Sequence, residues 1–338
     1  MGLYCGIDLH SNNSRVVVVD ESDRAVFSKR LPNDLGAILR ELAPYRNEIV
    51  GIVVESTFNW YWLVDGLVES EYPVFMANPS AIQQYSGLKY TDDDSDARWL
   101  AHLLRLGVLP QGYIYPREQR PVRDLLRKRS QLVRQKVADI LSIQNLFSRN
   151  LGLRLSADKI RKLTGEDVDG LIGDELLALA VKSTLSVLRG IESEIDHLET
   201  VVKRQVKQRP WYILLKSVPG IGEILALTIM LETGDIARFV KVGNFASYCR
   251  CVGSKKLTNG KVKGKGNTKN GNKYLAWAFI EAAHFAIRFD NQIQRYYQRK
   301  KAKTKGVIAI KAVAHKLARA CYFIMKNQTP FNVARAFA

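Results

Sequence analysis

The chain has 338 residues, 46% of them hydrophobic, and a formal net charge of +18 at pH 7. This length and apolar content suffice for a sizeable core and exclude a disordered polycation, while four scattered cysteines exclude a disulfide framework. The longest apolar runs are shorter than the ~20 residues that cross a bilayer, and no basic and apolar leader precedes them, so we expect a cytoplasmic protein with no membrane partner.

The first part of the chain, residues 1–116, alternates strand and helix patterns. Apolar stretches joined by short polar turns predict a meander of three strands, over 4–10, 15–21 and 25–31. Two later strands are expected over 48–56 and 73–78, and helices over 34–44, 60–70, 79–86 and 94–107. A meander followed by alternating helices and strands indicates a mixed α/β sheet.

The middle part, residues 117–208, follows a proline-bearing charged stretch that marks a boundary. Apolar residues at helical spacing predict two long helices, over 121–149 and 174–207. Two long consecutive helices favour an antiparallel or an intermolecular coiled coil, which would serve as a linker and an oligomerisation segment.

The last part, residues 209–338, opens with the sequence Pro-Gly-Ile-Gly (219–222) before an apolar helix. This pattern is typical of a helix-hairpin-helix, which grips a phosphate through backbone N–H groups, and equally of a plain turn at the start of a helix. Further helices are expected over 238–249, 271–289 and 306–325. The segment is therefore expected to be mainly α-helical.

Charge is unevenly divided along the chain. Residues 1–116 carry 9 Lys and Arg against 15 Asp and Glu (net −6), and the remainder carries 42 against 18 (net +24). A basic part of this size makes a phosphate-rich partner the first expectation. Nucleic acid fits better than a membrane surface, because much of the excess lies in a Gly- and Asn-rich loop and not on an amphipathic helix.

Four acidic residues in the first part stand where a site is expected. Asp8 and Glu55 each end a predicted strand, where side chains of an α/β sheet are open to solvent. Asp93 and Asp96 lie three apart at a helix start and share its core-facing side. Carboxylates brought so close together repel unless cations neutralise them, and oxygen ligands suit Mg²⁺ or Mn²⁺.

A plainer interpretation of these acids stays open. Asp92, Asp93 and Asp94 are common decoration at a helix N-terminus, and each strand-end acid taken alone could be incidental. Two strand-end acids together with an i, i+3 pair favour the metal site.

A lysine-rich loop in the last part predicts a nucleic-acid-binding surface. Between positions 250 and 273 it has eight basic residues and no acidic one: Arg250, Lys255, Lys256, Lys261, Lys263, Lys265, Lys269 and Lys273. A loop that is merely solvated would normally mix charges of both signs. Lysines spaced by glycine and asparagine suit contact with a sugar-phosphate backbone without base readout.

The motifs that contain these residues resemble a known family. GIDLH, VVEST and KYTDDDSDA in the first part, with VPGIGEILALTIMLETGDIARF, FASYCRCVG and NGKVKGKGNTKNGNKYLAWAFIEAAHFAIR in the last, are similar to the Asp-Glu-Asp-Asp (DEDD) transposases of bacterial insertion sequences. That group includes the Piv invertase and the bridge-RNA-guided recombinases. The resemblance implies a RuvC-like, ribonuclease-H-type first domain, a coiled-coil segment and a C-terminal transposase domain with a helix-hairpin-helix-like element.

The resemblance also implies an activity and its residues. By motif position the four acids are Asp8, Glu55, Asp93 and Asp96, with Asp92 and Asp94 left open by a one-residue slip. A serine would attack a DNA phosphodiester and form a covalent phosphoserine. Relatives carry serine near an S-x-G pattern, where this chain has Thr258, so Ser254 is preferred and Thr258 is the alternative. Ser247 lies in a predicted helix.

The implied partners are donor and target DNA and a noncoding guide RNA, in a homodimer or homotetramer associated with the nucleoid. The runner-up is a RuvC-like nuclease or Holliday-junction resolvase that hydrolyses DNA with water. A third class is an RNA-binding scaffold whose site has decayed.

Overall fold

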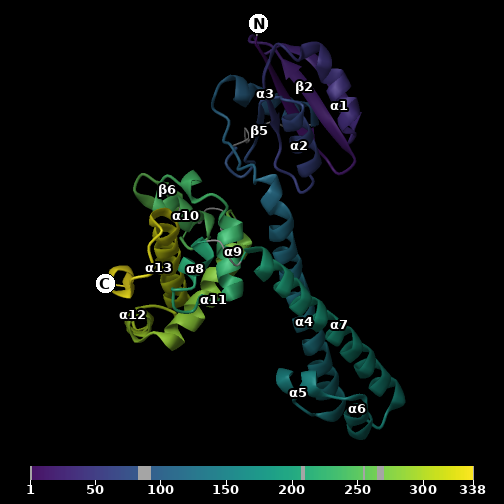
Figure 1. Ribbon diagram of the computed structural model, residues 1–338, viewed down its shortest axis with the longest axis vertical. Coiled ribbons are helices and arrows are strands. Elements are labelled where there is room, and N and C mark those ends of the chain that lie inside the picture. Colours follow the sequence, from purple (N-terminus) through teal and green to yellow (C-terminus); the bar gives the residue numbers. More distant parts are fainter. Residues whose placement is uncertain (1, 83–92, 207–209, 254–255, 265–269, 338) are drawn as a thin grey trace. The chain divides into compact units, whose positions relative to one another are not determined.

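The computed structural model describes residues 2–82, 93–206, 210–253, 256–264 and 270–337, with the side chains of 93, 256 and 257 excepted (Figure 1). Contacts divide the chain into two units, Met1–Arg117 and Glu118–Ala338. The division falls next to the boundary expected from the sequence. The long helices and the C-terminal helices share the second unit, and a further division at 208/209 remains a prediction.

A five-stranded mixed sheet forms the centre of the first unit, in the order β3-β2-β1-β4-β5. β1, β2 and β3 form an antiparallel meander, and β4 and β5 run parallel to β1. The strands span Leu3–Leu9, Asn13–Val19, Ala25–Pro32, Ile49–Val54 and Val74–Met76. This confirms the predicted mixed α/β sheet.

Helices cover both faces of this sheet, and side-chain alternation decides which residues each face receives. The helices are α1 (Leu35–Leu42), α2 (Tyr61–Glu69) and α3 (Asp93–Arg105), with a 3-10 turn, η1, at Ala43–Tyr45. Ile7 and Leu9 of β1 join the core with α1 and α2. Gly6 and Val53 lie on the other face, against α3.

One predicted helix is not formed in the part that the structure describes. Of the segment 79–86, residues 79–82 make a turn in which the amides of Ala81 and Ile82 donate to the carbonyl of Asn78. The rest of that segment lies outside the described residues. Asn78 is itself tied to the carbonyl of Pro110 at 2.8 Å.

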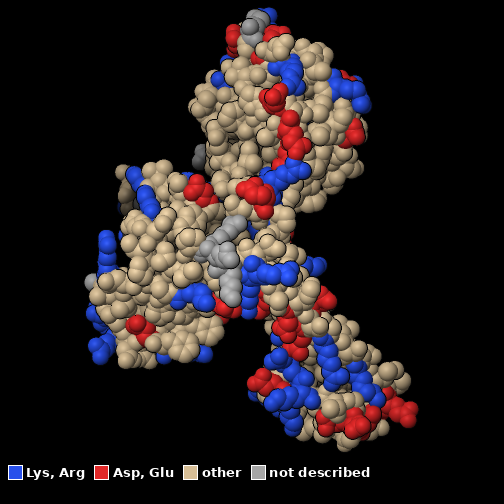
Figure 2. Space-filling model, in the orientation of Figure 1, with Lys and Arg blue, Asp and Glu red and all other residues tan. Residues whose placement is uncertain are grey.

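The second unit begins with a hairpin of two long helices, α4 (Arg120–Leu151) and α7 (Glu175–Val206), after a 3-10 turn, η2, at Arg117–Gln119. Ion pairs join Arg129 to Glu199 and Lys136 to Glu192. Positions that rise on α4 meet positions that fall on α7, so the helices are antiparallel within one chain. Both blue and red side chains are present on this hairpin in Figure 2.

Two short helices that the sequence analysis did not anticipate close the tip of the hairpin, α5 (Ala157–Lys162) and α6 (Gly165–Leu171). Each places one fully buried residue, Ile160 and Val168, in the core formed by α4 and α7. A Thr164–Asp167 capping box starts α6.

The rest of the second unit is a helical domain around one large core. Its helices are α8 (Pro210–Leu215), α9 (Glu223–Thr233), η3 (Ile236–Arg238), α10 (Val242–Tyr248), α11 (Lys273–Phe289), α12 (Asn291–Lys301), α13 (Gly306–Asn327) and α14 (Val333–Phe337). A β-hairpin of β6 (Lys256–Thr258) and β7 (Lys261–Gly264) interrupts them. In the described part of the chain, no helix is long and apolar enough to cross a membrane.

A buried ion pair fixes α4 to this helical core. Arg127 Nε and Nη2 donate to the two carboxylate oxygens of Glu232 on α9, at 2.6 and 2.7 Å, and Glu232 is only 3% exposed. Asn272, which caps α11, donates to the same carboxylate at 2.7 Å. Three helices therefore meet at one carboxylate.

The Pro-Gly-Ile-Gly sequence forms a tight turn against α11. Gly220 has φ +84°, and a Cβ there would lie 2.4 Å from the carbonyl oxygen of Ala282. Glu223 at the start of α9 pairs with Lys203 and Lys216, at 3.0 and 3.6 Å. These contacts explain Gly220 by packing, and the choice between a plain turn and a phosphate-gripping hairpin remains a prediction.

Candidate active site

Asp8 and Glu55 lie side by side at the carboxyl ends of two neighbouring parallel strands. The amide of Glu55 donates to the carbonyl of Ile7 at 3.1 Å, which sets β4 in register with β1. Asp8 belongs to the α3-facing set of β1, and Glu55 continues the α3-facing set of β4 beyond Val53. Asp8 is only 3% exposed, which is unusual because burying a charged carboxylate is unfavourable.

Helix α3 brings Asp96 to the same place. Gly6 has no side chain where α3 crosses β1, and a Cβ there would lie 1.9 Å from the carbonyl oxygen of Ala97. This close approach sets Asp96, the residue before Ala97, over the end of the sheet. Glu55 and Asp96 line one cavity of about 340 Å³, together with Trp99 and Leu100.

The neighbouring carboxyl groups of Asp8 and Asp96 change the pKa of Glu55. Burial first, then a hydrogen bond with Asp8 and the charges of Asp8 and Asp96, raise the pKa of Glu55 to about 7. His10 acts in the opposite direction, and its Nε2 lies 3.2 Å from Asp8 Oδ2. The structure thus brings together Asp8, Glu55 and Asp96 of the four predicted acids.

The donor chemistry of this cluster fits a hard divalent cation, because such ions prefer carboxylate oxygens and would neutralise the charges that raise the pKa of Glu55. Asp93 begins α3, but its side chain lies outside the described residues, as does all of Asp92. Among the side chains that are described, no three of His, Cys, Asp or Glu form a group that could hold a metal ion. The set of four acids predicted from the sequence includes Asp93, so the described side chains are only part of that set.

Asp94 has a different role from its neighbours. It accepts hydrogen bonds from Arg15 Nε at 2.8 Å and Nη2 at 2.5 Å, and from the hydroxyl of Ser28. The Ser28 bond, and then Arg15, hold the pKa of Asp94 below its usual value. Asp94 therefore anchors the start of α3 to β2 and β3.

The far end of α3 is anchored as well. His102 Nδ1 lies 2.9 Å from Asp23 Oδ1, and Arg105 donates to the carbonyl of Glu21 at 3.0 Å. Both partners belong to the turn between β2 and β3. With both ends held, Asp96 keeps its place relative to the strand ends.

Of the two predicted nucleophiles, Thr258 is exposed and ends β6, opposite Lys261 in the hairpin. Asn259 and Gly260 form its turn with φ values of 49° and 73°. Ser254 lies outside the described residues. Ser247 lies in α10, as expected.

The predicted basic surface is described only in part. Lys261 and Lys263 are exposed on β7, and Lys273 is exposed at the start of α11. Lys255, Lys265 and Lys269, and the side chain of Lys256, lie outside the described residues. Arg250 donates through Nε and Nη2 to the carbonyl of Gly271, at 2.9 and 2.7 Å, which ties together the two ends of the segment that contains the hairpin.

Two residues that shape the site were missed in the sequence. A glycine inside a strand pattern signals a close backbone approach, and Gly6 carries that signal. Arg15 pairs with Asp8 in the register of β1 and β2, so its side chain points to the α3 face. Only the strand pairing reveals that role.

Replacing Gly6 by alanine is expected to destabilise the first unit by about 1–3 kcal/mol and to displace Asp96, because the new methyl group meets helix backbone that cannot move aside. Gly190→Ala is the matched control, since that exposed helical glycine has no atom within 4 Å of an added Cβ and alanine favours a helix. Denaturant unfolding measures both. Equal stability of the two variants would contradict the close approach.

In metal-free buffer containing EDTA, the first unit is expected to lose stability as the pH rises from about 5 to 8. Glu55 has an ordinary pKa of 4.5 and a folded pKa of about 7. The folded state therefore keeps a proton that the unfolded state releases, so the contribution is complete below 4.5 and is lost as the pH passes 7. Thermal unfolding of wild type and Glu55→Gln tests this: the variant should show a flatter profile, and an unchanged slope would refute the assignment.

Two family models match the chain. Residues 5–149 match a transposase model of the DEDD type of IS110, and residues 212–298 match the Transposase IS116/IS110/IS902 family. The first match contains the three clustered acids, and the second contains Thr258 and the whole lysine-rich loop.

Three relatives are similar over different lengths. The transposase for insertion sequence element IS1111A of Coxiella burnetii is 22% identical over 84% of this chain and 77% of its own. The uncharacterized 43.6 kDa protein of insertion element IS110 from Streptomyces coelicolor is 26% identical over 39% of this chain and 33% of its own. The 42 kDa protein of insertion element IS900 from Mycobacterium paratuberculosis is 23% identical over 49% and 42%. The chain thus spans less than half the length of two of these relatives.

Proposed function

Because this chain belongs to the DEDD transposase family of the IS110 and IS116 insertion sequences, we propose that it cuts and rejoins DNA to move such an element. The first unit would be the RuvC-like catalytic domain. Its three antiparallel strands followed by two parallel ones support this assignment. The second unit would supply the nucleophile and the nucleic-acid-binding surface.

The observation that carries the proposal is the meeting of Asp8, Glu55 and Asp96 at one end of the sheet. Such a cluster costs stability unless a cation occupies it, which is a property of a site and not of a scaffold. Asp8, Glu55, Asp93 and Asp96 would hold Mg²⁺ or Mn²⁺. When bound, such ions supply charge neutralisation at the phosphodiester.

The residues of the second unit would carry the covalent step. The Ser254 hydroxyl, or that of Thr258, would lose its proton and attack the phosphorus. One P–O ester bond to the leaving strand would break as the bond to the hydroxyl oxygen forms, and the leaving oxygen would take up a proton. The phosphoserine keeps the ester bond energy for rejoining. Lys261, Lys263 and Lys273 would hold the backbone by charge.

The partners would be donor and target DNA and a noncoding guide RNA that pairs with them. Strand exchange between two duplexes needs more than one active site, so we propose a homodimer or homotetramer. Exposed apolar residues on the α4/α7 hairpin, such as Val137 and Leu141, support a role of that hairpin in assembly.

Trapping a covalent protein–DNA adduct tests the proposed chemistry. With Mg²⁺, donor and target DNA and flanking RNA, wild type should form an adduct that Ser254→Ala abolishes. Thr258→Ala should retain it, and Ser247→Ala, an exposed serine in α10, is the matched control. Loss in Thr258→Ala alone would transfer the role to threonine. Hydrolysed DNA ends with no adduct in any variant would favour the resolvase.

A further inference from the structure

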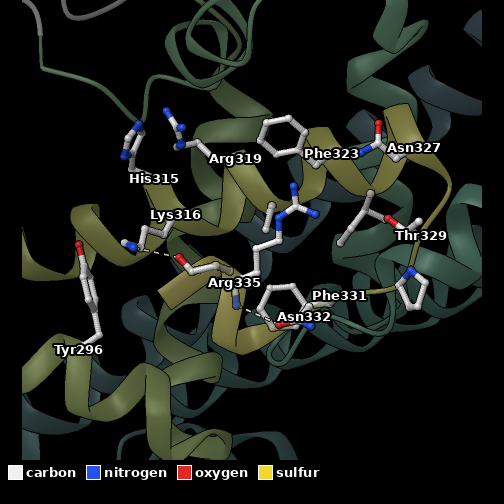
Figure 3. Close-up of a pocket in the computed structure, with 14 residues that line it drawn as sticks. Tyr296, His315, Lys316, Arg319, Phe323, Asn327, Thr329, Phe331, Asn332 and Arg335 are labelled. Atoms are coloured by element: carbon white, nitrogen blue, oxygen red, sulfur yellow. Dashed lines mark hydrogen bonds between the residues drawn. The ribbon is translucent and has the colours of Figure 1, made fainter. Parts of the chain in front are cut away.

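A second cavity, of about 450 Å³, lies in the second unit between α13 and the last residues of the chain (Figure 3). His315, Arg319, Phe323 and Asn327 of α13 contribute to its wall. They are spaced four residues apart and therefore form one stripe on the helix. The opposite side of α13 is buried in the helical core.

The facing wall is held in place by hydrogen bonds. The amide of Phe331 donates to the hydroxyl of Ser217 at 2.9 Å, and Lys316 Nζ donates to the carbonyl of Ala336 at 2.9 Å. Asn332 accepts from the amide of Arg335 at 2.9 Å. The cavity is thus preformed, and its volume lies in the range of ~300–1,000 Å³ that is usual for small-ligand sites.

The charge of the cavity lining is one-sided. Among the described residues that line the cavity are His315, Lys316, Arg319 and Arg335, and none of them is acidic. Burial first, and then Arg319, lower the pKa of both His315 and Lys316. Arg319 and Arg335 form no ion pair with any residue that the structure describes. An anion would relieve this repulsion.

The cavity also presents flat apolar surfaces. Phe323 is 41% exposed, and Phe331 is half-buried on the facing wall. Figure 3 labels Phe323 on α13 and Phe331 and Arg335 among the last residues of the chain. Asn327 and Thr329 add amide and hydroxyl groups at one end.

We propose that this cavity binds one unpaired nucleotide of a nucleic-acid strand, with the base against Phe323 and Phe331 and the phosphate at Arg319 and Arg335. An inorganic anion alone would make no stacking contact with the two rings. A base inside a duplex is already stacked on its neighbours and has no free face for them. Only the source of the strand rests on the proposed function. The cavity chemistry is common to RNA and DNA.

Strand-binding measurements on the full-length protein test this. Fluorescence anisotropy compares a labelled single strand, as RNA and as DNA, with a strand of equal length made of abasic nucleotides. Phe323→Leu should weaken binding of the intact strand about tenfold, which corresponds to about 1.4 kcal/mol, and leave the abasic strand unchanged. Arg319→Gln should weaken both strands. A preference for RNA or for DNA identifies the source.

Matched controls are Phe289→Leu, an exposed phenylalanine on α11, and Arg149→Gln, an exposed arginine on α4, both expected to leave affinity unchanged. The proposal is overturned if Phe323→Leu weakens binding of the intact and the abasic strand equally. It is also overturned if Arg319→Gln and Arg335→Gln weaken binding of neither strand, in which case the basic cavity would fit an acidic protein partner instead. A wild-type protein that binds no nucleic acid at all would refute this proposal and the proposed function together, whereas the variant results above would overturn this proposal alone.

Discussion

Replacing Asp8 by asparagine is expected to reduce DNA strand cleavage about 10³-fold and, in metal-free buffer, to raise the midpoint of thermal unfolding. Both effects have one physical cause. The Asp8 carboxylate is buried beside Glu55, where the negative charges of the two groups oppose each other until a cation binds. A neutral amide removes that repulsion together with a ligand. Loss of activity with gain of stability is the mark of a functional residue.

Asp96→Asn should behave in the same way, since its charge also raises the pKa of Glu55. Glu48→Gln is the matched control, because this exposed acid precedes β4 at the opposite end of the strand. Nucleic-acid binding should stay close to wild type in all three variants, because the lysine-rich loop belongs to the other unit. Cleavage that survives in Asp8→Asn, or binding lost in parallel with it, would contradict this division of roles.

Replacing Glu232 by leucine is expected to destabilise the second unit by about 3–5 kcal/mol. The substitution leaves the Arg127 guanidinium without the carboxylate that neutralises it and Asn272 without an acceptor. Burial opposes the charged form of Arg127, and the hydrogen bond and the charge of Glu232 more than offset it, so the pKa of Arg127 is raised in wild type. Without Glu232 only the burial remains, and a guanidinium cannot become neutral in a protein. Denaturant unfolding should show the loss in the transition of the second unit.

Two further variants make this test specific. Asp169→Asn breaks an ion pair with Lys182 in which both side chains are exposed, so it should cost at most about 1 kcal/mol. The double variant Arg127→Leu and Glu232→Leu should recover much of the stability, because it leaves no buried charge behind. A cost for Glu232→Leu no larger than that for Asp169→Asn would show that the pair does not hold the helices together.

The sheet of the first unit could be predicted because its strands are short apolar runs between polar turns. The positions of Asp8 and Glu55 followed from the same pattern, since parallel strands end at one edge. To know which face of the sheet each side chain occupies, the register of the strands was needed as well. Asp94 illustrates this limit: it stands between two predicted metal ligands, and only the pairing of β1 with β2 brings Arg15 beneath it.

Elements without an apolar stripe could not be predicted. Helix α12 buries only Ile293, so its sequence has no apolar periodicity and is indistinguishable from that of a charged loop. The cavity on α13 could not be predicted either. In the sequence its lining residues have the pattern of an exposed helix surface, and only the folding of the last residues of the chain against that surface forms a cavity; these residues are His315, Arg319, Phe323 and Asn327. Ser254 and several lysines of the loop lie outside the described residues.

The ion pairs of the α4/α7 hairpin bear on how the protein would respond to salt. Arg127, Arg129 and Lys136 look like part of a basic face, but each already has a carboxylate within 3.1 Å. Cations neutralised within the protein release no counterions when a polyanion arrives. The slope of log affinity against log salt should therefore reflect the exposed lysines of β7 and α11 and the arginines of the α13 cavity, and be much shallower than a formal charge of +18 would give.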